Sequence, residues 1–560
     1  MLSYTRRVRA SVPGSTGPAC PEGEAEARQA KRFTRRVGLV TAGTMVSRLL
    51  GLARESVFAW LFGAGLATDA FNVAFRIPNF LRDVFAESAL SAAFVPAFVG
   101  SLRRDPPERT RDFAAAVLNA LTLAVGLIVV FGMVFTPAVV RVIAAGFAGQ
   151  PDKLALTVQL TRVMFPFLLF VAWAAWAMGI LNACGTFFVP AVAPGAFNLV
   201  SIAVPLATFG WLRGIGVEPI TGMAWGVTLG ALAQVAVQLP RLHRHGFRWR
   251  PVFDFAGPEV RRVFTRWLPV VLGLASWQIS ALVNTFLLTF LPEGSVTWVN
   301  YAYRIQHLPA GLFGVAIGSV ALAEYSHRAG GSAGAIRDSF RHATGLVSTL
   351  TIPAALLLMV LAGPVVALVY QHGRFTAADA VNTSQALALY CLGIWAAAAA
   401  RNCAAGFYAL GNTRVPAFSA AAAVAVNIGI NLLLMGRIGF RSFPLAASAG
   451  QFLHLAVLFA LLRRRTGGLG GRAVARLTVR VLAAAVGAAA LALALARLWT
   501  FLPGVGTLGY RLGHAFLPGL LGVGGYYLLA RLLRIAEVRA VFAQLVFRRN
   551  PQAGDGRLNS

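Results

Sequence analysis

Charged residues, and acidic ones above all, are scarce in this chain. Only 12% of its 560 residues are charged, with 20 Asp and Glu against 50 Lys and Arg. Soluble globular proteins carry about 25% charged residues, so the composition excludes that class. The chain is instead 57% hydrophobic with a mean hydropathy of +0.68, which indicates an all-α polytopic membrane protein.

Motifs for catalysis and metal binding are also missing. The eight histidines include no HExxH sequence, and no CxxC pair occurs among the cysteines, which are Cys20, Cys184, Cys391 and Cys403. Metal-dependent hydrolysis and thiol redox chemistry rely on such spacings. We therefore expect a protein that is not an enzyme and that holds neither a metal nor a cofactor.

A net charge of +30 could suggest nucleic acid as a partner. The basic residues, however, fall in short loops between apolar stretches and form no continuous basic face, which argues against nucleic acid. Loops such as SLRRDPPERTRD are rich in arginine, whereas LPEGSV and FGAGLAT contain none. The positive-inside rule then predicts that the basic loops and both termini are cytoplasmic.

About fourteen stretches can cross a membrane, since a helical span needs about 20 apolar residues. The expected spans are 37–62, 68–100, 113–140, 154–183, 188–210, 218–240, 264–291, 295–325, 343–370, 380–409, 416–436, 443–462, 473–498 and 511–534. Residues 1–36 lack the apolar core of a signal peptide, and we expect a disordered basic cytoplasmic tail there.

Matching motifs reveal an internal repeat. NVAFRI and NYAYRI begin 228 positions apart, at Asn72 and Asn300, and GTFFVPA and GNTRVPA begin 226 positions apart. The copies are six spans apart and share one orientation, which predicts two parallel six-helix repeats plus two extra C-terminal helices. The expected parts are a tail at 1–36, an N-lobe at 37–240, a cytoplasmic linker at 241–263, a C-lobe at 264–462, spans 13–14 at 463–534 and a cytoplasmic tail at 535–560.

A polar stripe runs along the second expected span. Its members recur at helical spacing, with Arg82 beside them, and are Asp69, Asn72, Arg76, Asn79, Asp83 and Glu87. A charge at the centre of a bilayer costs about 2.5–3.5 kcal/mol or more. We therefore expect the stripe to face a water-filled interior.

Two other spans add polar residues to this interior. They are Ser47, Arg48, Arg54 and Glu55 on the first span, and Asn300, Arg304 and His307 on the eighth. Guanidinium groups dominate, and their forked contacts match phosphate geometry, so we expect an anionic substrate. In the alternative, structural interpretation, arginines and acids seven residues apart, such as Arg48 and Glu55, neutralise each other.

The run SRLLGLARESVFAWLFGAGLATDAFNVAFRIPNFLRDVFAESALSAAFVPAF (47–98) resembles the opening of the MurJ/MviN family, the bacterial lipid II flippases. Similar sequence continues through FPFLLF, GSVTWVNYAYRIQHLPAGLFGVAIG, YQHGRFTAAD and GFYALGNTRVP, over nearly all spans. The resemblance implies a fourteen-helix transporter of the superfamily that includes multidrug extruders and polysaccharide exporters. It would move lipid II, an undecaprenyl-pyrophosphate-linked disaccharide pentapeptide, to the outer leaflet of the cytoplasmic (inner) membrane by alternating access.

The same resemblance implies roles for particular residues and partners. The family's essential cavity residues correspond to Arg48, Arg54, Asp69 and Arg304, which would bind the substrate, and spans 13–14 would form a groove for the polyprenyl tail. Some relatives have acidic sodium ligands in spans 7 and 11, where this chain has asparagines. The implied partners are lipid II, membrane lipids and other cell-wall synthesis proteins, and we expect a monomer.

Three other functions compete with this interpretation. A related exporter could carry another polyprenyl-linked glycan or a drug, although an extruder of cationic drugs would need an acidic cavity. A polyprenyl-phosphate glycosyltransferase would need an acidic metal cluster, and the loop 241–267 has only Asp254 and Glu259. A membrane scaffold with a basic recruiting tail is the third alternative.

Overall fold

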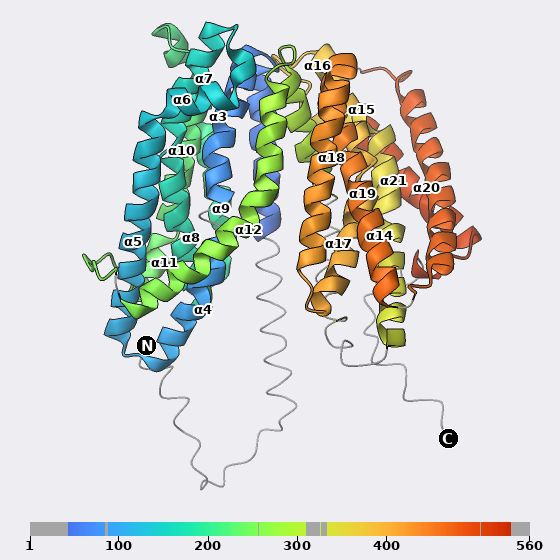
Figure 1. Cartoon of the computed structure of the whole chain (residues 1–560). Coiled ribbons are helices and arrows are strands. Elements are labelled where there is room, and N and C mark those ends of the chain that lie inside the picture. Colours follow the sequence, from blue (N-terminus) through green and yellow to red (C-terminus); the bar gives the residue numbers. More distant parts are fainter. Residues whose placement is uncertain are drawn as a thin grey trace, which may run out of the picture. The chain divides into compact units, whose positions relative to one another are not determined.

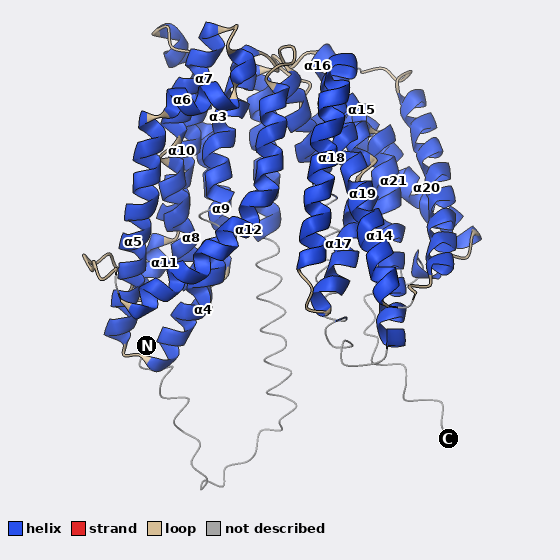
Figure 2. Cartoon of the chain, in the orientation of Figure 1, coloured by secondary structure: helices blue, strands red, loops and turns tan. Residues whose placement is uncertain are grey.

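The structure is a computed structural model, and it describes residues 43–83, 88–255, 257–307, 309, 325, 333–466, 468–504 and 506–538. The expected N-terminal tail, most of the C-terminal tail and Glu87 lie outside the described residues. Figure 2 shows helices joined by loops, with no strand in the described part. Nine described helices are long and apolar enough to cross a membrane. The all-α prediction is confirmed, and the number fourteen stays a prediction.

The chain divides into two compact units, and the first contains Met1–Phe58 and Leu66–Phe286. Its helices, labelled in Figure 1, follow a helix over residues 43–62; they are α3 (Leu66–Arg82), α4 (Ser88–Arg104), α5 (Pro107–Val134), α6 (Thr136–Ile143), α7 (Pro151–Met164), α8 (Phe167–Ala183), α9 (Phe188–Gly214), α10 (Thr221–Ala236), α11 (Leu239–Arg244) and α12 (Pro258–Leu288). Helix α10 packs along α9 and α8, and α3 packs along α7.

The second unit contains Ala59–Gly65 and Leu287–Ser560. After a helix over residues 295–307 its helices are α14 (Ala333–Val360), α15 (Ala362–Val369), α16 (Ala377–Cys391), α17 (Ile394–Ala409), α18 (Arg414–Ile438), α19 (Ser442–Arg465), α20 (Gly471–Trp499) and α21 (Leu508–Leu532). Helix α19 packs along α18 and α17, as α10 packs along α9 and α8. The two extra helices, α20 and α21, pack on each other and on α14.

The internal repeat is visible in the helix boundaries. A helix of 28 residues and then one of 8 occur as α5 and α6, and again as α14 and α15, whose first residues lie 226 positions later. Helices α16 and α18 likewise begin 226 positions after α7 and α9. Proline contributes to the breaks, because it has no N–H for the helical ladder and is favoured in a first turn. Pro137 is the second residue of α6, and Pro166 lies between α7 and α8.

The short segment 59–65 belongs to the second unit and contacts it through its backbone. Its sequence does not predict these contacts. The N–H of Arg374 donates to the carbonyl of Trp60 at 3.1 Å. Gly373 has a φ of +60°, and a Cβ there would lie 2.3 Å from the Trp60 carbonyl oxygen. Only glycine therefore allows the loop between α15 and α16 to approach Trp60 this closely.

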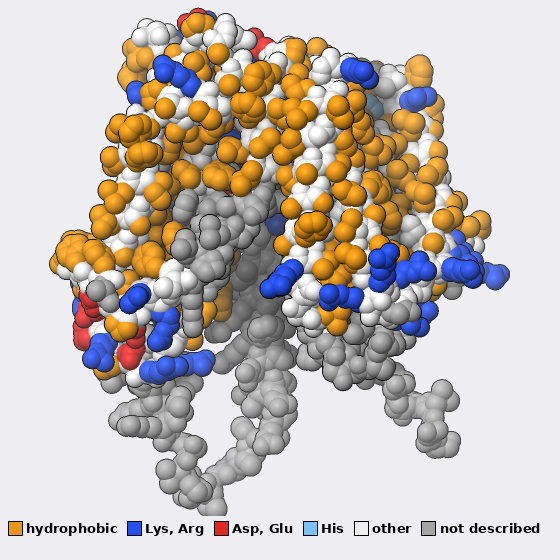
Figure 3. Space-filling model, viewed as in Figure 1, with side chains coloured by type: hydrophobic (Ala, Val, Ile, Leu, Met, Phe, Trp, Pro, Cys, Tyr) orange, Lys and Arg blue, Asp and Glu red, His pale blue; other side chains and the backbone are white. Residues whose placement is uncertain are grey.

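The outward faces of the helices are apolar. On α5, for example, the exposed side chains include Leu123, Leu127, Val130 and Phe131. Figure 3 shows hydrophobic side chains over the middle of α18 and α19 and basic side chains gathered at their lower ends. Exposed apolar helix faces of this extent fit a lipid environment.

Candidate functional site

Arg54, on the helix over residues 43–62, is oriented by two neighbours. Its Nη2 donates to Oε1 of Glu55 at 2.6 Å, and its guanidinium carbon lies 5.3 Å from the ring centre of Phe197 on α9. Glu55 is only 5% exposed. A carboxylate and an aromatic face both attract a guanidinium. The structure therefore makes these two predicted site residues a pre-oriented ion pair.

A cavity of about 260 Å³ inside the first unit brings Arg54 together with Arg82 of α3. Three carboxamides also line it, from Asn198 on α9 and from Gln234 and Gln238 on α10, and the rest of its wall is apolar. The guanidinium groups are hydrogen-bond donors, so this wall can receive an anionic group, whereas the amides of Asn198 and Gln238 already donate to backbone carbonyls. The carboxamides are residues that sequence reasoning missed, because an isolated Asn or Gln in an apolar helix has no distinctive pattern.

Arg82 repeats the arrangement of Arg54 at the end of α3. Its Nη2 donates to Oδ1 of Asp83 at 2.7 Å, and Gln278 of α12 donates from Nε2 to the other Asp83 oxygen at 2.8 Å. Arginines and acids thus pair as adjacent residues here, whereas the alternative sequence interpretation considered acids seven residues away. Each cavity arginine has its own carboxylate, so the local excess of positive charge is smaller than the sequence predicted.

Asp69, predicted to bind substrate, is buried in the first unit against a lysine that the sequence interpretation missed. Its Oδ2 lies 3.1 Å from Nζ of Lys153 on α7, and both side chains are 1% exposed. The same Nζ lies 4.2 Å from the ring centre of Phe147. At this end, the polar stripe of α3 meets packed protein rather than water. The only sign of this ion pair in the sequence was a lysine at the start of an apolar span. The spacing between Lys153 and Asp69 along the chain gave no reason to pair them.

The other predicted residues of the first unit differ in burial. Asn72 is 6% exposed, Arg76 and Asn79 are half-buried, and Arg48 is exposed. The carbonyl of Ser47 accepts a hydrogen bond from Nδ2 of Asn198 at 3.0 Å, which connects the first helix to the wall of the cavity.

The second unit holds Asn300, Arg304 and His307 on the helix over residues 295–307. Nδ2 of Asn300 donates to the carbonyl of Val296 at 2.8 Å. Arg304 is half-buried. The His307 ring packs edge-on against Tyr303, with ring centres 4.2 Å apart.

A hydrogen bond and a helix cap position this group. Trp298 donates from Nε1 to Oδ1 of Asp379 at 2.9 Å, and Asp379 also forms a capping box with Thr376 at the start of α16. Arg401 of α17 lies close enough to His307 to interact with it electrostatically. Sequence reasoning missed Arg401, although a lone arginine inside the run AAAAARNCAAG was a usable signal. The structure thus groups Arg54 with Arg82 in the first unit.

Comparisons with known proteins point to one family. The family model described as "Lipid II flippase MurJ" matches residues 58–509. A "Probable lipid II flippase MurJ" of Vibrio cholerae serotype O1 is 34% identical over 446 residues, which cover 78% of this chain and 83% of that protein. The "Lipid II flippase MurJ" of Burkholderia cenocepacia is 33% identical over 436 residues, covering 76% and 83%.

Solved structures agree on the fold. A structure of "Lipid II flippase MurJ, inward closed conformation" superposes with a TM-score of 0.73 at 22% identity and covers 90% of this chain and 99% of that one. An inward-facing multidrug resistance transporter of the MATE family gives a TM-score of 0.60 at 17% identity and covers 77% and 98%.

Proposed function

The chain belongs to the MurJ family of lipid II flippases, and we propose that it moves lipid II from the inner to the outer leaflet of a bacterial cytoplasmic membrane by alternating access. The observation that carries this proposal is the cavity shared by Arg54 and Arg82. A pyrophosphate offers several charged oxygens, which match the forked donors of a guanidinium better than those of an ammonium.

The proposed roles divide the site residues by their exposure. Arg48, Arg54, Arg82 and Arg304 contact the pyrophosphate, because a guanidinium can exchange its protein partner for a phosphate of higher charge. Glu55 holds Arg54 in place when no substrate is bound, and the 2.6 Å contact supports this role. Asp69 acts through Lys153, by holding the first turns of α3 and α7 together.

The lobes supply the movement in this proposal. Two repeats of like orientation rock about the membrane midplane during the transport cycle. The polyprenyl tail stays in lipid along α20 and α21, whose outward side chains include the exposed Leu498, Leu520 and Leu528. The protein works as a monomer with both termini in the cytoplasm.

Complementation tests the proposal directly. The full chain is expressed in cells depleted of their own lipid II flippase, and growth is measured together with the lipid II that reaches the outer leaflet. Wild type should restore both, and an R54A/R304A variant that reaches the membrane in equal amount should restore neither. Wild-type protein that is present in the membrane but leaves lipid II inside would favour an exporter of another polyprenyl-linked glycan or of a drug.

A further inference from the structure

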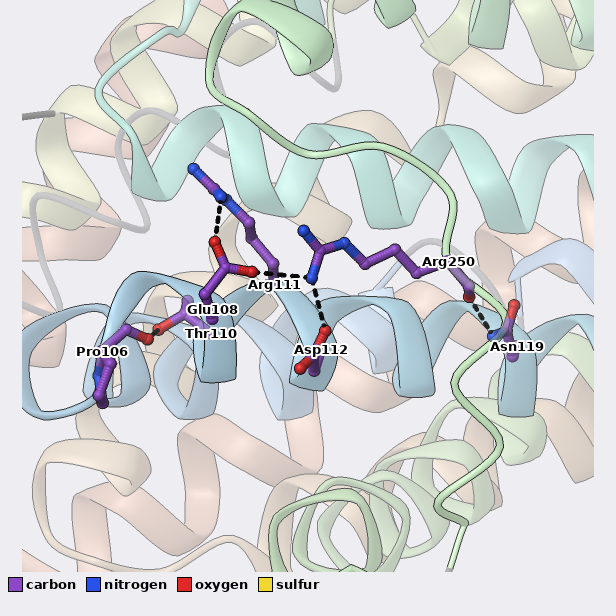
Figure 4. Close-up of polar contacts among 7 residues, drawn as sticks. All are labelled: Pro106, Glu108, Thr110, Arg111, Asp112, Asn119 and Arg250. Atoms are coloured by element: carbon purple, nitrogen blue, oxygen red, sulfur yellow. Dashed lines mark hydrogen bonds and ion pairs between the residues drawn. The ribbon is translucent and has the colours of Figure 1, made fainter.

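The loop that follows α11, residues 246–255, is tied to the side of α5 by one asparagine (Figure 4). Nδ2 of Asn119 donates to the carbonyl of Arg250 at 2.9 Å, as Figure 4 shows. It also donates to the carbonyl of Val252 at 2.8 Å. Oδ1 of the same side chain accepts from Nε1 of Trp249 at 3.1 Å. Asn119 is 7% exposed. A single buried amide therefore satisfies two backbone carbonyls and one indole N–H of this loop, which we call the anchor loop.

Ion pairs tie the same loop to the beginning of α5 (Figure 4). Nη1 of Arg250 lies 2.9 Å from Oε2 of Glu108 and 2.9 Å from Oδ1 of Asp112. The other Glu108 oxygen accepts from Arg111 at 2.7 Å. Exposed ion pairs contribute only about 0–1 kcal/mol each. Their role here is geometric, because together with Asn119 they hold both the side chain and the backbone of Arg250.

These contacts place the anchor loop across the polar–apolar boundary of α5. The acids Glu108 and Asp112 lie in its first turns, and no charged residue occurs between Phe113 and Val134. Asn119 lies seven residues beyond Asp112, which is about 10 Å along a helix axis. Non-helical backbone is tolerated near hydrocarbon only when its polar groups are satisfied. Asn119 satisfies the hydrogen-bonding capacity of two carbonyls of the anchor loop by donating to both of them.

The outward side of the anchor loop carries three aromatic side chains and one exposed carboxylate, Asp254. Trp249 is 67% exposed, Phe253 65% and Phe255 38%. The indole N–H of Trp249 is already bound to Asn119, so the part of its ring that faces outward is apolar. Arg244 and Arg248 are exposed beside it in the chain. At the left edge of the molecule, where α5 and α11 lie, Figure 3 shows hydrophobic side chains directly above charged ones.

The geometry points to a lipid-binding role: the anchor loop binds the anionic phospholipid surface of the membrane that holds the chain. Its aromatic rings enter the interface between headgroups and acyl chains, where Trp and other aromatic side chains are favoured. Arg244 and Arg248 contact the phosphates of anionic lipids, each contributing about 1 kcal/mol or fivefold in association. The loop would thereby hold the first unit at a defined depth, independently of what the chain transports.

Fluorescence quenching in nanodiscs tests this surface on the full chain. An environment-sensitive label is attached to F253C in a C20S/C184S background, in phosphatidylcholine with or without phosphatidylglycerol. Lipids brominated on their acyl chains should quench the label, brominated phosphatidylglycerol more strongly than brominated phosphatidylcholine, and aqueous iodide should quench it weakly. R109C, labelled at the exposed start of α5, is the matched control and should respond to iodide instead.

Variants separate the anchoring contacts from the lipid contacts. N119A removes all three hydrogen bonds between Asn119 and the loop, so it should release the loop and increase iodide quenching of the label. R244Q/R248Q should instead keep the label in lipid and abolish the preference for phosphatidylglycerol. Equal quenching by the two brominated lipids in the parent would overturn the anionic assignment. Iodide quenching at the level of the R109C control would show that the loop faces water or another protein.

A second measurement does not depend on labelling. The fluorescence of Trp249 is taken as the difference between the parent and W249F, and brominated lipid should reduce that difference. A difference that brominated lipid leaves unchanged would overturn the proposal.

Discussion

Asp69 and Lys153 form an ion pair across α3 and α7, with 3.1 Å between Oδ2 and Nζ and only 1% of each side chain exposed. The pair connects the first turns of the two helices, 84 positions apart in the chain. The ring of Phe147 packs on the ammonium group. Two buried charges of opposite sign stabilise each other, and removing one partner of such a pair is strongly destabilising.

Removing Lys153 should therefore cost more than removing both partners. We expect K153M to lower the free energy of unfolding by about 3–5 kcal/mol, because it removes the buried ammonium group that compensates the charge of the Asp69 carboxylate. D69N/K153M should recover part of that loss, since no net charge is then buried. Thermal unfolding in detergent measures both. A K153M variant as stable as wild type would show that the pair contributes little.

The contribution of Arg54 to flipping should depend on the bidentate hydrogen bonds of its guanidinium group and not only on its charge. R54A should reduce flipping about ten- to a hundredfold, as expected for a lost charge-assisted contact of about 1.5–3 kcal/mol. R54K should recover only part of the activity, because an ammonium cannot make bidentate contacts. E55Q is the matched control, since it loosens Arg54 and keeps the guanidinium. Outer-leaflet lipid II in flippase-depleted cells is the readout, and full activity of R54A would contradict the assignment.

Arg304 should behave like Arg54 from within the second unit. R304A is expected to abolish complementation while the protein still reaches the membrane, and R304K to restore it in part. R441Q is a suitable control, because Arg441 is an exposed arginine of the same unit whose Nε binds Gln385 at 2.8 Å. Growth and membrane content are measured for all three. Equal growth of the R304A and R441Q strains would remove Arg304 from the site.

His372 predicts a pH dependence of stability. It lies in the loop between α15 and α16, where burial and then the positive charge of Arg511, 3.2 Å from its Nδ1, lower its pKa below 6.5. The unfolded chain then binds more protons than the folded one as pH falls, so this contribution to stability is complete above pH 6.5 and is lost below it. The Tm of wild type should fall on acidification more than that of H372Q. Parallel pH profiles would argue against this effect.

The hydropathy of the sequence and the spacing of its motifs were sufficient to predict the helical architecture and its internal repeat. Apolar stretches of the length of a bilayer predicted the helices, because a buried backbone without water must bond to itself. The matched motifs predicted the repeat, and helices α5 and α14 begin 226 positions apart, as one of those motif pairs does. The polar stripe of α3 was also readable, since side chains on a helix recur with its period.

The partners of those polar residues were decided only by tertiary packing. A helical pattern specifies which face a side chain occupies, and it limits direct contacts within the helix to near neighbours. It cannot specify which other helix lies opposite. Lys153 meets Asp69, and Asn119 binds the loop at Arg250, because helices and loops distant in sequence pack at particular depths and angles. Those depths and angles depend on the close packing of many side chains at once, which no single stretch of sequence contains.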